Sequence, residues 1–66
     1  MGERVMEHID WTNLAQVLCY ARRLAANAPD GMYVVRYSTR SNYNIMHPDR
    51  YARVKDCYTF DYVKHI

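Results

Sequence analysis

The sequence predicts a small α+β domain, in which one N-terminal amphipathic helix packs on an antiparallel β-sheet of about three strands. Two patterns of apolar residues and the length of the chain support this class. Apolar residues recur at helical spacing in the first half of the chain and alternate with polar residues in the second half. The length of 66 residues leaves room for one small core and one domain. Within 1–66 we expect an arm at 1–9, a helix at 10–28 and a sheet region at 32–65.

The helix is expected from residue 10 to residue 28. Its apolar stripe follows helical spacing and consists of Trp11, Leu14, Val17, Leu18, Ala21, Leu24, Ala25 and Ala28. Asp10 is the expected N-cap, because its carboxylate can accept hydrogen bonds from the free amide groups of the first turn. The run NAPDG at 27–31 combines residues that end helices and form turns, so the chain should leave the helix there.

Two strands are predicted next, joined as a hairpin. The segment 32–39 (MYVVRYST) is rich in Val and Tyr, which favour strands. One face of this strand should carry Tyr33, Val35 and Tyr37. The segment 43–47 (YNIMH) is expected to pair back with it through a turn at 40–42.

The last strand is predicted at 57–65 (CYTFDYVKH), where alternation places Tyr58, Phe60 and Tyr62 on one face. The segment 48–56 before it is ambiguous between a strand and a short helical turn that begins at Pro48. Short connections favour an antiparallel meander, with the helix laid across one face of the sheet.

Both faces of this sheet are partly apolar, but a single helix covers only one of them. The other face would present Tyr and Val side chains to water. An exposed apolar patch of that kind marks an interaction surface or a dimer seam. Strand alternation does not tell which face the helix covers.

Cysteine usage and the absence of long apolar runs predict a cytoplasmic protein. No stretch approaches the roughly 18 apolar residues of a membrane span. The first ten residues include Glu3, Arg4, Glu7 and Asp10 and contain no apolar run, so we expect no signal peptide and no membrane association. Two cysteines in such a chain, Cys19 and Cys57, should be reduced.

Residues able to perform chemistry form no recognisable pattern, so we expect neither an enzyme nor a metal-binding or cofactor-binding protein. Zinc sites normally need closely spaced ligand pairs, and no such pair occurs among His8, His47, His65, Cys19 and Cys57. Ser38 and Ser41 lie in no signature of a nucleophile beside a base. The two glycines do not form a phosphate-binding loop.

Arginine and tyrosine are the residues that indicate a function. The chain has seven tyrosines, and seven of its nine basic residues are arginine. Both types are enriched at the energetically important centres of protein interfaces. The candidate binding residues are Tyr33, Arg36, Tyr37, Arg40, Tyr43, Arg50, Arg53, Tyr58, Phe60 and Tyr62.

These residues predict a non-catalytic binding protein that acts through a macromolecular interface. As a small chain without a predicted signal peptide, it resembles the accessory proteins of phages and other mobile elements, which implies inhibition of a host or defence protein complex. If a phage encodes the chain, the expected compartment is the cytoplasm of the host cell. Nucleic acid is a second candidate partner, because basic groups contact phosphates and aromatic rings stack on bases. Asp49, Asp56 and Asp61 lie among the basic residues of 36–64 and weaken their positive field. A second copy of the chain is a further candidate partner.

One short segment suggests a third ligand. The segment 30–38 (DGMYVVRYS) resembles the strand of SH2 domains whose arginine binds phosphotyrosine, and a helix precedes it at a similar place. The segment 63–66 (VKHI) also has a similar position in that family. The resemblance implies that Arg36 binds a phosphate bidentately, with Ser38 and His65 beside it. Phosphate or phosphotyrosine recognition through Arg36 is therefore an alternative hypothesis.

Overall fold

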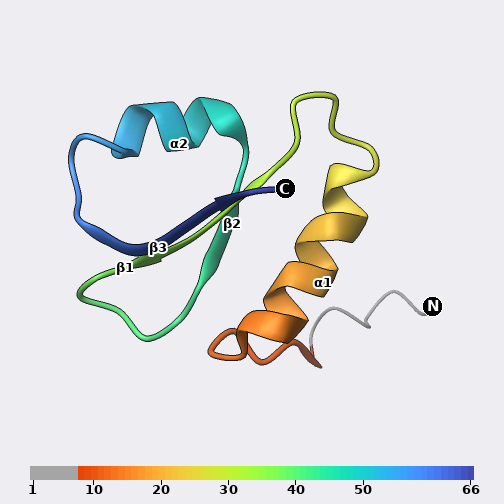
Figure 1. Cartoon of the computed structure of the whole chain (residues 1–66), viewed down its shortest axis with the longest axis horizontal. Helices are drawn as coiled ribbons and strands as arrows, with labels where there is room; N and C mark the ends of the chain where they lie inside the picture. Colours follow the sequence, from red (N-terminus) through yellow and green to blue (C-terminus); the bar gives the residue numbers. More distant parts are fainter. Residues whose placement is uncertain (1–7) are drawn as a thin grey trace.

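The computed structural model describes residues 8–66 and places a helix on each side of a three-stranded sheet (Figure 1). The elements follow in the order α1 (Leu14–Ala25), β1 (Tyr33–Tyr37), β2 (Asn44–Met46), α2 (Pro48–Val54) and β3 (Phe60–His65). This arrangement confirms the predicted α+β class. The predicted arm at 1–9 lies almost entirely outside the described residues. No helix within 8–66 has the length and apolar character that crossing a membrane requires.

The helix α1 begins at Leu14 because Asn13 caps it, so the predicted N-cap at Asp10 was wrong. Asn13 has extended backbone, and its side-chain oxygen accepts a hydrogen bond of 3.3 Å from the backbone N–H of Gln16. Asp10 instead accepts bonds from the backbone N–H and hydroxyl of Thr12, at 3.0 and 2.6 Å. The carboxylate therefore closes a separate turn before the helix, and the nearer of two suitable residues becomes the cap.

Gly31 turns the chain from the helix into β1 at a position that requires glycine. Its φ of +78° lies in the left-handed region, and an added Cβ would collide with the carbonyl oxygen of Ile66. The close approach brings the end of the chain against the start of β1. Met32 and Ile66 exchange two backbone hydrogen bonds there, at 3.4 and 2.8 Å.

The sheet is not the predicted meander, because β1 is its central strand. The strand order is β2-β1-β3, and both outer strands pair antiparallel with β1. The outer strands therefore run parallel to each other, and parallel strands need a crossover connection. The short helix α2 forms part of that crossover, which resolves the ambiguous segment 48–56 as mainly helical. Pro48 opens this helix, at a position where proline is favoured.

A bulge in β3 separates two aromatic residues that alternation places together. Tyr62 lies opposite Arg36, Phe60 lies opposite Tyr37, and the register shifts between these pairs. Asp61 is therefore an extra residue in β3, and an extra residue reverses the alternation of side chains beyond it. Phe60 and Tyr62 lie on opposite faces, so the prediction of one shared face was wrong.

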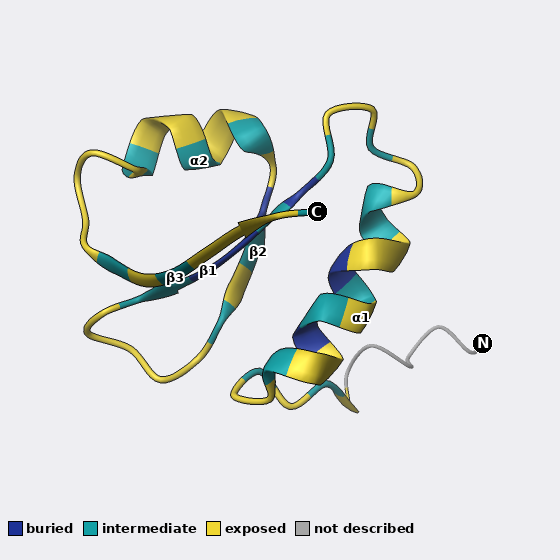
Figure 2. Ribbon diagram, viewed as in Figure 1, coloured by how far each residue is buried: buried dark blue, intermediate teal, exposed yellow. Residues whose placement is uncertain are grey.

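The helix α1 covers the face of the sheet that carries Val34. Val17 and Ala21 of α1 form a fully buried cluster with Val34, and Figure 2 shows the buried residues of α1 and β1. The partly buried side chains packed around the cluster are Ile9, Trp11, Leu14, Leu18, Tyr43, Ile45, Tyr62 and Ile66. The neighbours of Val34 in β1 point to the opposite face. Tyr51 of α2 stacks there on Tyr33, so the two helices cover opposite faces.

Replacing Val34 with alanine should lower the free energy of unfolding by about 2 kcal/mol, because it removes buried methyl groups and leaves a cavity. Val54 near the end of α2 is only partly buried, so Val54→Ala should cost less than about 1 kcal/mol. Urea unfolding followed by circular dichroism measures both values. Equal losses in the two variants would contradict a core centred on α1 and β1.

The pKa of Asp10 lies below its ordinary value of 3.8, because its carboxylate accepts hydrogen bonds from the hydroxyl and then the backbone of Thr12. A lowered pKa in the folded state means that these bonds stabilise the protein above the unfolded-state pKa, and that this contribution is lost as the pH falls through the folded-state pKa. An NMR titration of the Asp10 carboxyl carbon should therefore give a midpoint under 3.8. Thr12→Val should raise that midpoint, and an unchanged value would show that the hydroxyl contributes nothing.

Candidate functional site

The sheet face turned toward α2 is lined by aromatic rings, and Tyr33 holds one end of this layer together. Its ring stacks on Tyr51 with 4.2 Å between centroids and on His65 with 4.6 Å between centroids. Two rings stacked on a third must lie on its opposite sides. Neither side of the Tyr33 ring is therefore free for a ligand, and its role is to attach α2 and the end of β3 to the sheet.

The other end of the aromatic layer is open. Tyr37 packs against Phe60, with 4.9 Å between the ring centroids. It meets Tyr58 edge to face, with 5.2 Å between the centroids and 82° between the ring planes. Tyr58 lies in the turn before β3 and is 58% exposed. An edge-to-face contact leaves much of the Tyr58 ring uncovered, so this ring remains available to a partner.

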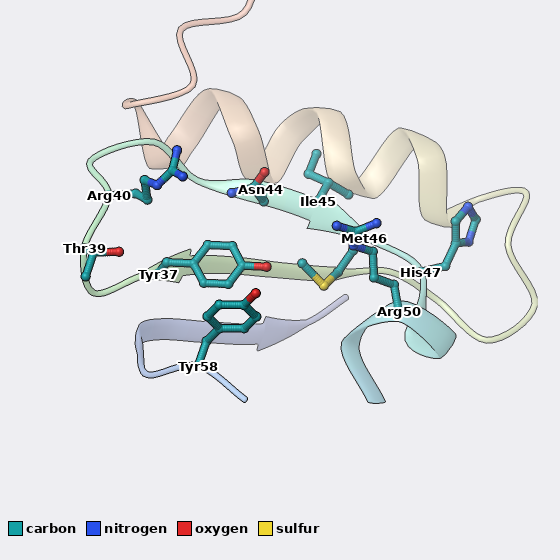
Figure 3. A pocket seen from close by; sticks show the side chains of 9 residues that line it. All are labelled: Tyr37, Thr39, Arg40, Asn44, Ile45, Met46, His47, Arg50 and Tyr58. Atoms are coloured by element: carbon teal, nitrogen blue, oxygen red, sulfur yellow. The ribbon is translucent and has the colours of Figure 1, made fainter. Parts of the chain in front are cut away.

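Beside Tyr37 and Tyr58 lies an open pocket of about 560 Å³, which Figure 3 shows from close by. Its lining residues are Tyr37, Thr39, Arg40, Asn44, Ile45, Met46, His47, Arg50 and Tyr58. We call it the arginine–tyrosine pocket. Arg50 extends from α2 over Met46, on the side toward which the Tyr37 hydroxyl points. Arg40 lies at the opposite end of the pocket. Strand β1, strand β2, α2 and the turn before β3 therefore all contribute to one site.

The arginine–tyrosine pocket carries positive charge without a carboxylate in its lining. Arg40 and Arg50 form no ion pair with any residue in 8–66. Asp61 is paired instead with Arg36, at 3.2 Å. Asp49 lines a different hollow, formed with residues 27–31. Asp49 and Asp61 therefore lie outside the pocket and do not reduce its positive charge by lining it. The pocket suits an anionic group.

The other predicted binding residues lie elsewhere. Tyr43 and Tyr62 pack against the core under α1 and meet each other edge to face at 5.6 Å. Phe60 lies inside the aromatic layer, between Tyr37 and Tyr51. Arg53 is exposed in the last turn of α2, outside the pocket lining. The predicted residues that the pocket brings together are Tyr37, Arg40, Arg50 and Tyr58.

Several pocket residues were missed in the sequence. Asn44 and Met46 lie on β2 opposite Val35 and Tyr33, and so share the face that carries Tyr37. The predicted hairpin and the alternation of its strands could have indicated both of them. His47 and Thr39 lie in connections, where no periodic pattern marks the direction of a side chain.

Arg36 is held on the face of the sheet toward α1. Its guanidinium is paired with Asp61 and lies 5.6 Å from the ring centroid of Tyr43, while its Nε is buried without a hydrogen-bond partner. His65 stacks on Tyr33 on the other face. The structure does not bring together the arginine and the histidine that the SH2 resemblance places side by side.

The remaining candidate ligands are dispersed. Within the described part of the chain, no three His, Cys, Asp or Glu side chains gather as a metal site would require. Cys19 and Cys57 are free and exposed. Comparison with known proteins found no matching family model, no matching curated protein and no matching solved structure. The geometry of the arginine–tyrosine pocket is therefore the basis for a functional interpretation.

Replacing Tyr33 with alanine should lower the free energy of unfolding by about 3 kcal/mol, since it removes the ring stacked between α2 and β3. Tyr58→Ala should cost less than about 1 kcal/mol, because the Tyr58 ring is mostly exposed. Thermal unfolding of the two variants measures the difference. If Tyr58→Ala proved the more damaging substitution, the assignment of one ring to structure and the other to contact would be wrong.

Proposed function

We propose that this chain is a non-catalytic binding protein, which uses the arginine–tyrosine pocket to contact a negatively charged group on a macromolecular partner. The observation that supports the proposal is the arrangement of Arg40 and Arg50 in one open pocket without a carboxylate. Two guanidinium groups with no ion-pair partner in residues 8–66 gain most from an external anion.

The pocket also offers the other components of a protein interface. Arginine binds carboxylates and phosphates through two parallel hydrogen bonds, which fixes the orientation of the partner. The exposed Tyr58 ring supplies a rigid contact that is apolar along the ring and polar at the hydroxyl. Residues of these two types commonly dominate the binding energy of an interface.

The partner that we propose first is a protein complex of a host or of a defence system, bound through an acidic part of its surface and inhibited by occlusion. The small size of the chain supports this idea by analogy with phage and mobile-element accessory proteins. The two exposed free thiols suit a reducing compartment, and we therefore propose that the protein acts in the cytoplasm.

Single-stranded nucleic acid is the second candidate, and the same pocket gives it specific support. Arginine side chains near an exposed aromatic ring suit a strand whose phosphates need cations and whose bases stack on rings. Asp61 lies against Arg36 and Asp49 lines another hollow, so neither opposes a phosphate in the pocket.

Arg50→Ala should weaken binding to an anionic probe by roughly tenfold or more, since a hydrogen bond to a charged group contributes about 1.5–3 kcal/mol. Arg23→Ala, in the last turn of α1, removes the same charge outside the pocket lining and should change affinity much less. Fluorescence anisotropy with a labelled glutamate-rich peptide and a labelled single-stranded oligonucleotide measures both effects.

The preferred probe decides between the two partner classes. Binding of the peptide alone supports a protein partner, and affinity capture with the native chain and with Arg50→Ala as baits should then recover a complex that only the native chain retains. Binding of the oligonucleotide, with a steep loss as salt rises, supports nucleic acid. Equal losses in Arg23→Ala and Arg50→Ala would mean that overall charge rather than the pocket binds the probe.

A further inference from the structure

We propose that the free edge of β3 is a second interaction site, which pairs antiparallel with β3 of a second copy across a two-fold axis. The proposal does not depend on the arginine–tyrosine pocket. It follows from the backbone groups that β3 leaves unpaired, from the exposure of Val63, and from the charges along the strand.

The position of β3 in the sheet leaves one of its edges without a partner strand. The order β2-β1-β3 makes it an outer strand, and no other described strand pairs with its far side. Unpaired N–H and C=O groups in such an edge form a template for another strand. With six residues, β3 is the longer of the two outer strands, because β2 has three.

The hydrogen bonds to β1 determine which groups of β3 point outward. Met32 and Ile66 exchange both of their backbone bonds, so they form a hydrogen-bonded pair. Such pairs alternate along an antiparallel ladder, which directs the backbone groups of Lys64 and Tyr62 toward β1 as well. The N–H and C=O groups of Val63 and His65 therefore face outward, where a second strand can bind them.

The side chains along this edge suit a second copy. Val63 is 43% exposed, and it lies near the centre of the regular part of β3, between the bulge at Asp61 and the end of the strand. An exposed valine at a sheet edge loses contact with water when an apolar residue lies opposite it. A two-fold axis through Val63 supplies such a residue, because it places Val63 opposite itself.

The charged side chains along β3 favour a two-fold axis at Val63 over an axis at either neighbouring residue. A two-fold axis at Lys64 would set two ammonium groups directly opposite each other, which destabilises a strand pair. An axis at Tyr62 would place Val63 opposite the carboxylate of Asp61. The axis at Val63 instead sets Lys64 opposite Tyr62 of the second copy, so that an ammonium group meets an aromatic ring on each side.

The resulting dimer has one continuous sheet with the strand order β2-β1-β3-β3-β1-β2. No residue of β3 lines the arginine–tyrosine pocket, so both copies of the pocket stay open in the dimer. Each dimer therefore presents two equal pockets, and a partner with repeated anionic groups could engage both of them.

The first test is the mass of the full chain in solution. Sedimentation equilibrium should show an average mass that rises from 7.9 kDa toward twice that value, over a roughly hundredfold increase in chain concentration. Val63→Asp places two carboxylates at the axis and should hold the chain at the monomer mass. The matched variant Val63→Thr keeps a β-branched side chain and should still associate. A monomer at every concentration would overturn the proposal.

The second test examines the register. In a chain with Cys19→Ser and Cys57→Ser, Val63→Cys should form a disulfide between copies under mild oxidation, because paired strands bring opposite Cα atoms to about 5.5 Å. Asn44→Cys lies on the other outer strand and should remain reduced. Cross-linking through Tyr62→Cys in preference to Val63→Cys would contradict the register, and cross-linking through Asn44→Cys would contradict the choice of edge.

Discussion

The burial of β1 on both faces is the constraint on which the rest of the structure depends. Val34 and Val35 are consecutive in the strand and both are fully buried, although their side chains point in opposite directions. A central strand of this kind needs a cover on each side. The helix α1 supplies one cover, and α2 with its stacked tyrosine supplies part of the other. The segment that connects β2 to β3 must pass over the face that α1 leaves open. The same need for a cover therefore explains why this connection contains α2.

This constraint divides the aromatic residues into two groups. Tyr33, Tyr51 and Phe60 complete the thinner cover over the sheet, where a helix of seven residues supplies too few apolar side chains. Tyr37 and Tyr58 continue the same layer beyond the helix, so the layer ends in an edge-to-face pair beside open space. The pocket is therefore the place where the second cover stops. Its positive charge arises because arginines from the hairpin and from α2 border this end, while Asp61 is paired with Arg36 and Asp49 lines another hollow.

Periodicity predicted the element types and the class, but it could not predict how the elements are joined. The apolar stripe of α1 and the Val and Tyr content of β1 are local signals, and both were sufficient to find these elements. The central place of β1 depends on long-range pairing, and no local pattern distinguishes it from a meander. The candidate site was only partly predictable for the same reason. Tyr37 and Tyr58 were expected together with Tyr62, but the bulge at Asp61 sends Tyr62 into the core under α1.

The bulge also decides what a change of length in β3 would do. Asp61 is the single extra residue that lets Phe60 enter the aromatic layer while Tyr62 enters the core. A deletion of Asp61 would make the two rings consecutive, and consecutive residues of a regular strand point to opposite faces. The rings would share a face only if the strand kept Asp61 and lost the bulge. Relatives of this chain should therefore either keep the bulge or lack its extra residue, and in both cases one ring stays on each face of the sheet.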